Sequence, residues 1–76
     1  MLRLLVEEEN KLDRTREQLA RLERHISRLA EIIAKQVELI DRLRSLGQPV
    51  ARPEMVLATL NDLMATYIAH RKYYKG

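Results

Sequence analysis

The sequence predicts an all-α protein, a helical hairpin with coiled-coil character that assembles into an oligomeric helical bundle. Aliphatic residues recur every seven positions, and a repeat of that length keeps one seam of a helix facing a partner. The 76 residues include only two glycines and two prolines, and no Phe, Trp or Cys, which is typical of long helices. A single Gly/Pro interruption near residue 47 predicts one hairpin domain over residues 1–76. The heptad residues are Leu5, Leu12, Leu19, Ile26, Ile33 and Ile40.

The first helix is expected to run from about residue 2 to about residue 45. With Leu5 at position a of the heptad, position d is polar at Glu8, Thr15 and Gln36. Polar residues in a seam set register and oligomer state. From Ile26 onward, further apolar residues stand beside the seam, and so wide a face must be covered by two or more helices. These additional residues are Ala30, Ile32, Val37, Leu39 and Leu46.

A turn is expected at residues 46–52, followed by a second helix at about residues 53–74. Gly47 suits the positive φ of a residue that follows a helix, and Pro49 cannot continue that helix. Pro53 suits the first position of a new helix, and Glu54 suits the positive end of its dipole. The second helix therefore folds back on the first with a broad apolar face, formed by Val56, Leu57, Leu60, Leu63, Met64, Tyr67, Ile68 and Tyr74.

The two predicted helices differ in length, about 65 Å against about 32 Å at 1.5 Å per residue. Folding back across the turn places Tyr67 at the level of Ile32 and Tyr74 at the level of His25. Residues 2–22 then have no partner in their own chain, so another chain is expected to cover them. The predicted oligomer interface consists of Leu5, Leu12, Leu19, Leu22, Ile26, Leu29 and Ile33.

The partner predicted for this interface is a second copy of the chain, because two-fold dimers are the commonest soluble oligomers. A higher oligomer or another helical protein are alternatives. The long helices can cross antiparallel, so that the overhanging residues 2–22 of each copy lie along the hairpin of the other. Alternatively, these overhangs of the two copies can pair in parallel. We favour the antiparallel form, because Glu8 and Thr15 would oppose their own copies in a parallel seam.

Basic residues gather where the second helix is expected to end, with Tyr73 and Tyr74 among them. Basic residues with interleaved aromatics can hold single-stranded nucleic acid or other anions. The alternative is that the negative end of the helix dipole attracts these cations and that the Tyr rings pack on guanidinium planes. The candidate anion or nucleic-acid patch consists of Arg21, Arg24, Arg28, His70, Arg71, Lys72 and Lys75.

A second basic feature is a stripe at position c of the heptad. Glutamates four residues earlier compensate three of its five charges, which favours a solvated, salt-bridged face over a track for a phosphate backbone. The stripe consists of Arg14, Arg21, Arg28, Lys35 and Arg42.

The sequence offers no recognisable catalytic, cofactor or metal site. It contains no Ser/His/Asp set and no glycine-rich phosphate loop, so we expect no enzyme activity and no cofactor. His25, His70 and Glu23 would form only an incomplete metal site. No apolar run is long enough to span a bilayer, and the net charge is +3, so we expect a cytoplasmic protein.

From about residue 22 to residue 74 the chain resembles a group of short alphaproteobacterial proteins. The residues that carry the likeness are Arg24, His25, Ile26, Gln36, Leu39, Ile40, Leu43, Gly47, Leu57, Leu60, His70 and Arg71. The resemblance implies a helical hairpin without an assigned activity. The chain departs from that pattern at Pro49, at Pro53 and in its long apolar-tipped start.

The sequence therefore leaves three candidate functions. The first is a non-enzymatic structural or protein-interaction module that self-associates through heptad-patterned helices. The second is a nucleic-acid-binding accessory protein that uses the basic patch near residues 21–28 and 70–75. The third is attachment to an anionic membrane surface through Leu2, Leu4, Leu5 and Val6, with Arg3 nearby.

Overall fold

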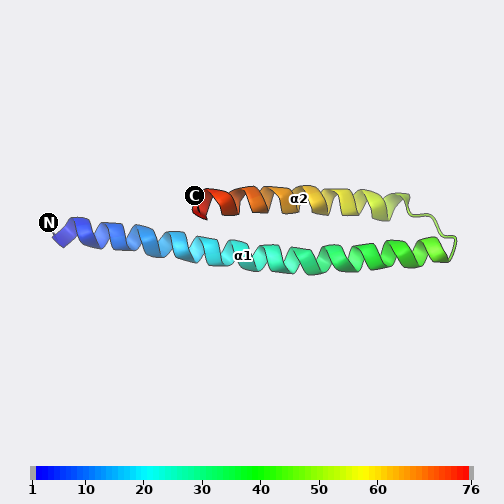
Figure 1. The fold of residues 1–76 in the computed structure, drawn as a ribbon, viewed down its shortest axis with the longest axis horizontal. Coiled ribbons are helices and arrows are strands. Elements are labelled where there is room, and N and C mark those ends of the chain that lie inside the picture. Colours follow the sequence, from blue (N-terminus) through cyan, green and yellow to red (C-terminus); the bar gives the residue numbers. More distant parts are fainter. Residues whose placement is uncertain (1, 76) are drawn as a thin grey trace.

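The computed structural model describes the backbone of residues 2–75 and the side chains of residues 11–74. Two helices, α1 (Leu2–Ser45) and α2 (Ala51–Lys75), account for nearly all of this part of the chain, which contains no strand. They lie antiparallel and side by side in a rod of 69 × 15 × 15 Å (Figure 1). The predicted all-α hairpin is confirmed, whereas assembly into a larger bundle remains a prediction.

The turn after α1 is built around Gly47, which adopts a φ of 71°. The Gly47 N–H donates to the Arg44 carbonyl at 3.1 Å, and the Gln48 N–H donates to the Leu43 carbonyl at 2.8 Å. This pair of bonds is the Schellman motif, which satisfies carbonyls at the end of a helix and favours glycine at the left-handed position. The role predicted for Gly47 is confirmed.

The second helix begins at Ala51, two residues before the predicted start. The Glu54 N–H donates to the Val50 carbonyl at 2.9 Å, which places Pro53 third in α2 rather than first. A proline is tolerated there because the first N–H groups of a helix have no partner within it.

The second helix reaches about two turns further along α1 than the sequence suggested. The Tyr67 ring lies 5.9 Å from the His25 ring, although we expected Tyr67 at the level of Ile32. Tyr74 lines a cleft with Gln18 instead of stopping at the level of His25. The overhang of α1 therefore comprises residues 2–17, roughly 24 Å, and it extends past the C-terminal end of α2 (Figure 1).

From about Leu19 onward, α2 covers the heptad seam of α1. Leu22, Leu29 and Ile40 are buried, and the polar seam residue Gln36 is half-buried. The facing row of α2 follows the same spacing of three and four residues, which keeps its side chains on one face. Its half-buried members are Pro53, Leu57, Leu60, Met64, Tyr67, Arg71 and Tyr74.

Candidate interaction surfaces

Four residues of the predicted oligomer interface lie between the two helices of the same chain. Leu22 and Leu29 are buried, and Ile26 and Ile33 are half-buried. Most of their surface is thus already covered within one copy. A surface for a second protein has to be sought among the side chains that remain exposed.

The remaining predicted interface residues belong to α1 near its N-terminal end. Leu12 is 57% exposed and projects from the overhang. Leu19 is half-buried, because α2 reaches the level of Gln18. The Leu5 side chain lies outside the described residues, as do those of Glu8 and of the proposed membrane anchor Leu2, Leu4 and Val6.

Large exposed aliphatic side chains gather on one side of the hairpin. Ile32 and Leu63 line the same shallow groove of about 170 Å³, together with Leu29 and Tyr67. Residues seven apart on a helix share a face, so Leu39 and Leu46 continue the α1 side of the groove, and Val56 continues the α2 side. The five residues that flank the groove and its continuation are each at least 40% exposed, namely Ile32, Leu39, Leu46, Val56 and Leu63. We call these five residues the apolar row.

Two basic residues alternate with the α1 members of the apolar row. Lys35 and Arg42 stand between Ile32, Leu39 and Leu46 at steps of three and four residues, the spacing of one helix face. Both are exposed. The apolar row therefore has a basic edge along α1.

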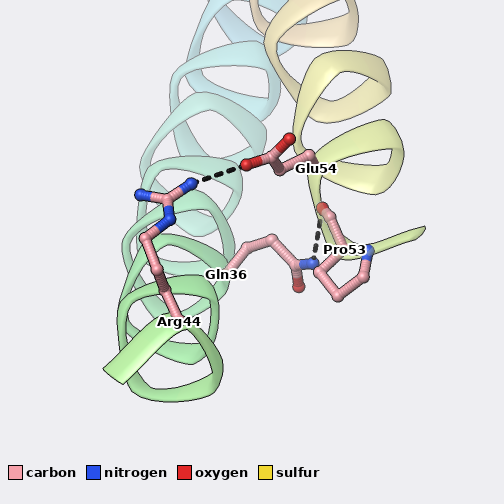
Figure 2. A network of polar contacts seen from close by, with 4 residues as sticks. All are labelled: Gln36, Arg44, Pro53 and Glu54. Atoms are coloured by element: carbon pink, nitrogen blue, oxygen red, sulfur yellow. Dashed lines mark hydrogen bonds and ion pairs between the residues drawn. The ribbon is translucent and has the colours of Figure 1, made fainter. Parts of the chain in front are cut away.

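The opposite side of the hairpin is less apolar. Val37 lines a groove of about 310 Å³ there with Ile40, Asp41 and Leu57. At the same groove the Arg44 guanidinium donates to the Glu54 carboxylate at 2.6 Å, an exposed ion pair (Figure 2). Exposed pairs of this kind are worth about 0–1 kcal/mol, so this one orients side chains more than it stabilises the fold.

The predicted basic patch is divided between surfaces. Arg21 and His70 line one cleft of about 280 Å³, together with Gln18, His25 and Tyr74. This cleft joins both helices and brings basic side chains of the patch beside the Tyr74 ring.

The other members of the patch lie elsewhere. Arg24 and Arg28 line a shallow surface of α1 beside Glu23 and Glu31, and Arg28 also lines the groove that contains Ile32, Leu63 and Tyr67. On α2, Arg71 is half-buried and Lys72 is exposed. The Lys75 side chain lies outside the described residues.

Neither a metal centre nor a membrane span is found in the described part of the chain. His25 and His70 share a cleft, yet no group of three His, Cys, Asp or Glu side chains in the described residues could hold a metal ion. No helix in the same residues is long and apolar enough to cross a bilayer.

No family model, curated protein or solved structure matches this chain. The candidate surfaces are therefore defined by the geometry of the hairpin alone. The sequence placed Ile32, Leu39 and Leu46 beside the seam and predicted that two or more helices cover the widened face, but it did not group them with Val56 and Leu63 as one exposed surface. The signal for that grouping is the same spacing of seven between Val56 and Leu63 on the second helix.

Proposed function

We propose that this chain is a non-enzymatic structural or protein-interaction module that self-associates through its helices. The observation that carries the proposal is the apolar row, which stays exposed although α2 already closes the seam of α1. Burying one large aliphatic side chain is worth up to about 1.5–3 kcal/mol. Because a core this small supplies only about 3–5 kcal/mol, covering the apolar row would contribute an amount comparable to the stability of the hairpin itself.

A second copy is the partner that we favour. Every copy carries both an exposed apolar row and an overhang with exposed Leu12, so two copies can offer each other the same surfaces. Contiguous exposed apolar side chains on a small protein mark interaction sites. Another helical protein is the alternative partner, and the resemblance to helical-hairpin proteins is compatible with either.

Sedimentation equilibrium at micromolar concentration tests this function. We expect at least a dimer, with the helical content that the two helices predict by circular dichroism. A chain that sediments as a stable, fully helical monomer over that range would contradict self-association.

The cleft between Gln18 and Tyr74 supports a second candidate function, the binding of nucleic acid. Arg21 and His70 bring donors for phosphate oxygens from both helices, and the Tyr74 ring lies in the same cleft. This activity would use a different surface from the apolar row, so the two functions can be tested separately.

A further inference from the structure

The apolar row is an exposed aliphatic surface with Lys35 and Arg42 along one edge, which suits an amphipathic helix. Resting on the self-association proposed above, we infer that this helix is the overhang, residues 2–17, of a second copy of the chain. The partner's overhang runs antiparallel to α1 and lies between α1 and α2. Each end of the dimer is then a three-helix bundle made from one hairpin and one overhang.

The lengths of the two elements agree. The overhang of 16 residues is about 24 Å long. Along α1 and the first residue after it, the apolar row extends from Ile32 to Leu46, 14 residue steps or about 21 Å. One overhang therefore covers the row from end to end and leaves none of its members bare.

The side chains are also complementary. The overhang carries five acidic residues and four basic ones, and three of the acidic residues stand together at Glu7–Glu9. The apolar row carries Lys35 and Arg42 along its edge, and Glu31 and Glu38 stand on the far side of these two cations from the row. The acidic cluster Glu7–Glu9 is favoured beside these two cations.

Symmetry decides the direction of the overhang. If the overhang ran parallel to the α1 helix that it covers, each copy would bind the next and the assembly would remain open. If the overhang runs antiparallel, each copy binds the overhang of the other in the same way, so the assembly closes at two copies. In this arrangement, residues 2–16 of one copy lie along residues 46–32 of the other, and the two-fold axis passes near residue 24.

Charges meet in the same arrangement. It brings Glu7 to the level of Asp41 and Arg42, and Asp13 to the level of Lys35. Leu12, which is exposed in a single copy, falls between the levels of Ile32 and Leu39.

Spin-label distances between two copies test this arrangement, and the lack of cysteine allows single labels at chosen sites. With Asn10→Cys, we expect a distance between the two labels of about 42 Å, set by 28 residue steps along antiparallel helices. With Arg24→Cys, we expect a distance below about 20 Å, because this site lies near the axis. A short distance at residue 10 would overturn the inference in favour of parallel zipping, while self-association would stand. No dipolar signal at either site would contradict self-association itself.

A matched pair of substitutions locates the surface. Leu39 on the apolar row and Val37 on the opposite side are 41% and 40% exposed. We expect Leu39→Asp to weaken dimerisation at least about tenfold, and Val37→Asp to change the dissociation constant less than about threefold. Equal effects of the two substitutions would overturn the inference.

A charge reversal provides a test that leaves the apolar residues in place. Arg42→Glu is expected to weaken the dimer about threefold to tenfold, and adding Glu7→Arg to the same chain is expected to restore it. Circular dichroism confirms that each variant is folded before its dissociation constant is measured. Failure of Glu7→Arg to restore any affinity would contradict the proposed register.

Discussion

The Gln36 side-chain amide on α1 donates a hydrogen bond of 3.0 Å to the Pro53 carbonyl in the first turn of α2 (Figure 2). The acceptor is a backbone atom, so the bond ties one level of α1 to one level of α2. Gln36 occupies a polar position of the heptad seam, and polar seam residues specify register. In this hairpin the register concerned is that between two helices of one chain.

Replacing Gln36 tests how much this bond stabilises the hairpin. We expect Gln36→Ala to lower the free energy of unfolding by about 1–2 kcal/mol, because a part-buried hydrogen bond and its packing are lost. Gln18→Ala is the matched control, since Gln18 is an exposed glutamine of the same helix. Urea unfolding followed by circular dichroism, at one fixed protein concentration, measures both variants. Equal effects would show that the bond does not contribute to stability.

The buried seam should dominate the stability of the hairpin. Leu29 is only 5% exposed, and we expect Leu29→Ala to cost about 2–4 kcal/mol because it leaves a cavity between the helices. That cost approaches the whole stability of a core this small. Met55→Ala, at a site 70% exposed, is expected to change stability by less than about 0.5 kcal/mol. Thermal unfolding compares the two, and a similar loss in both would contradict the assigned seam.

Gly47 should be needed for its backbone conformation alone. A Cβ placed there would meet nothing within 4 Å, so a substitution encounters no steric obstacle. Its φ of 71° is costly for a residue with a Cβ, and we expect Gly47→Ala to lower the free energy of unfolding by about 1 kcal/mol. Gly47→Asn should cost less, because Asn tolerates the left-handed region. A melting temperature that falls equally for both variants would contradict this explanation.

Local features of the fold could be predicted from the sequence, but the partner of each helix face could not. Gly47 carries a conformational preference of its own, so the turn was placed correctly. The heptad of Leu22 and Leu29 indicates only that a helix covers the seam, and the same spacing suits α2 or another chain. We assigned these residues to an interface between chains, and the structure shows α2 covering them within one chain.

The register of the hairpin was missed for a related reason. Proline is tolerated throughout the first turn of a helix, so Pro53 marks the beginning of α2 only to within a few residues. Starting α2 two residues earlier accounts for about 3 Å of the displacement, and the chain also returns to α1 far enough back for the Pro53 carbonyl to meet the Gln36 amide. Leu19 was therefore expected to be bare, and it is half-buried beside the last turns of α2.

This correction changes the substitution that best tests the overhang. Leu12→Asp is expected to weaken dimerisation at least about tenfold while leaving the hairpin folded, because Leu12 is exposed within one copy. Leu19→Asp would disturb the hairpin as well, since Leu19 is half-buried. Analytical ultracentrifugation measures the dissociation constant, and circular dichroism checks the fold. An unchanged dissociation constant for Leu12→Asp would contradict the role of the overhang.

The cleft between the helices allows the nucleic-acid hypothesis to be tested with few substitutions. If phosphate binds there, Arg21→Ser combined with His70→Ser should weaken binding of a labelled single-stranded oligonucleotide about tenfold or more at low salt. Arg52→Ser is the control, because Arg52 is an exposed cation at the other end of the hairpin. Fluorescence anisotropy at about 50 mM salt measures oligonucleotide binding by the wild-type chain, the double variant and Arg52→Ser. Wild-type binding weaker than about 100 μM would remove this function, because even non-specific binders reach that affinity at physiological salt. Equal losses in the double variant and the control would instead indicate diffuse attraction to a chain of net charge +3, with no role for the cleft.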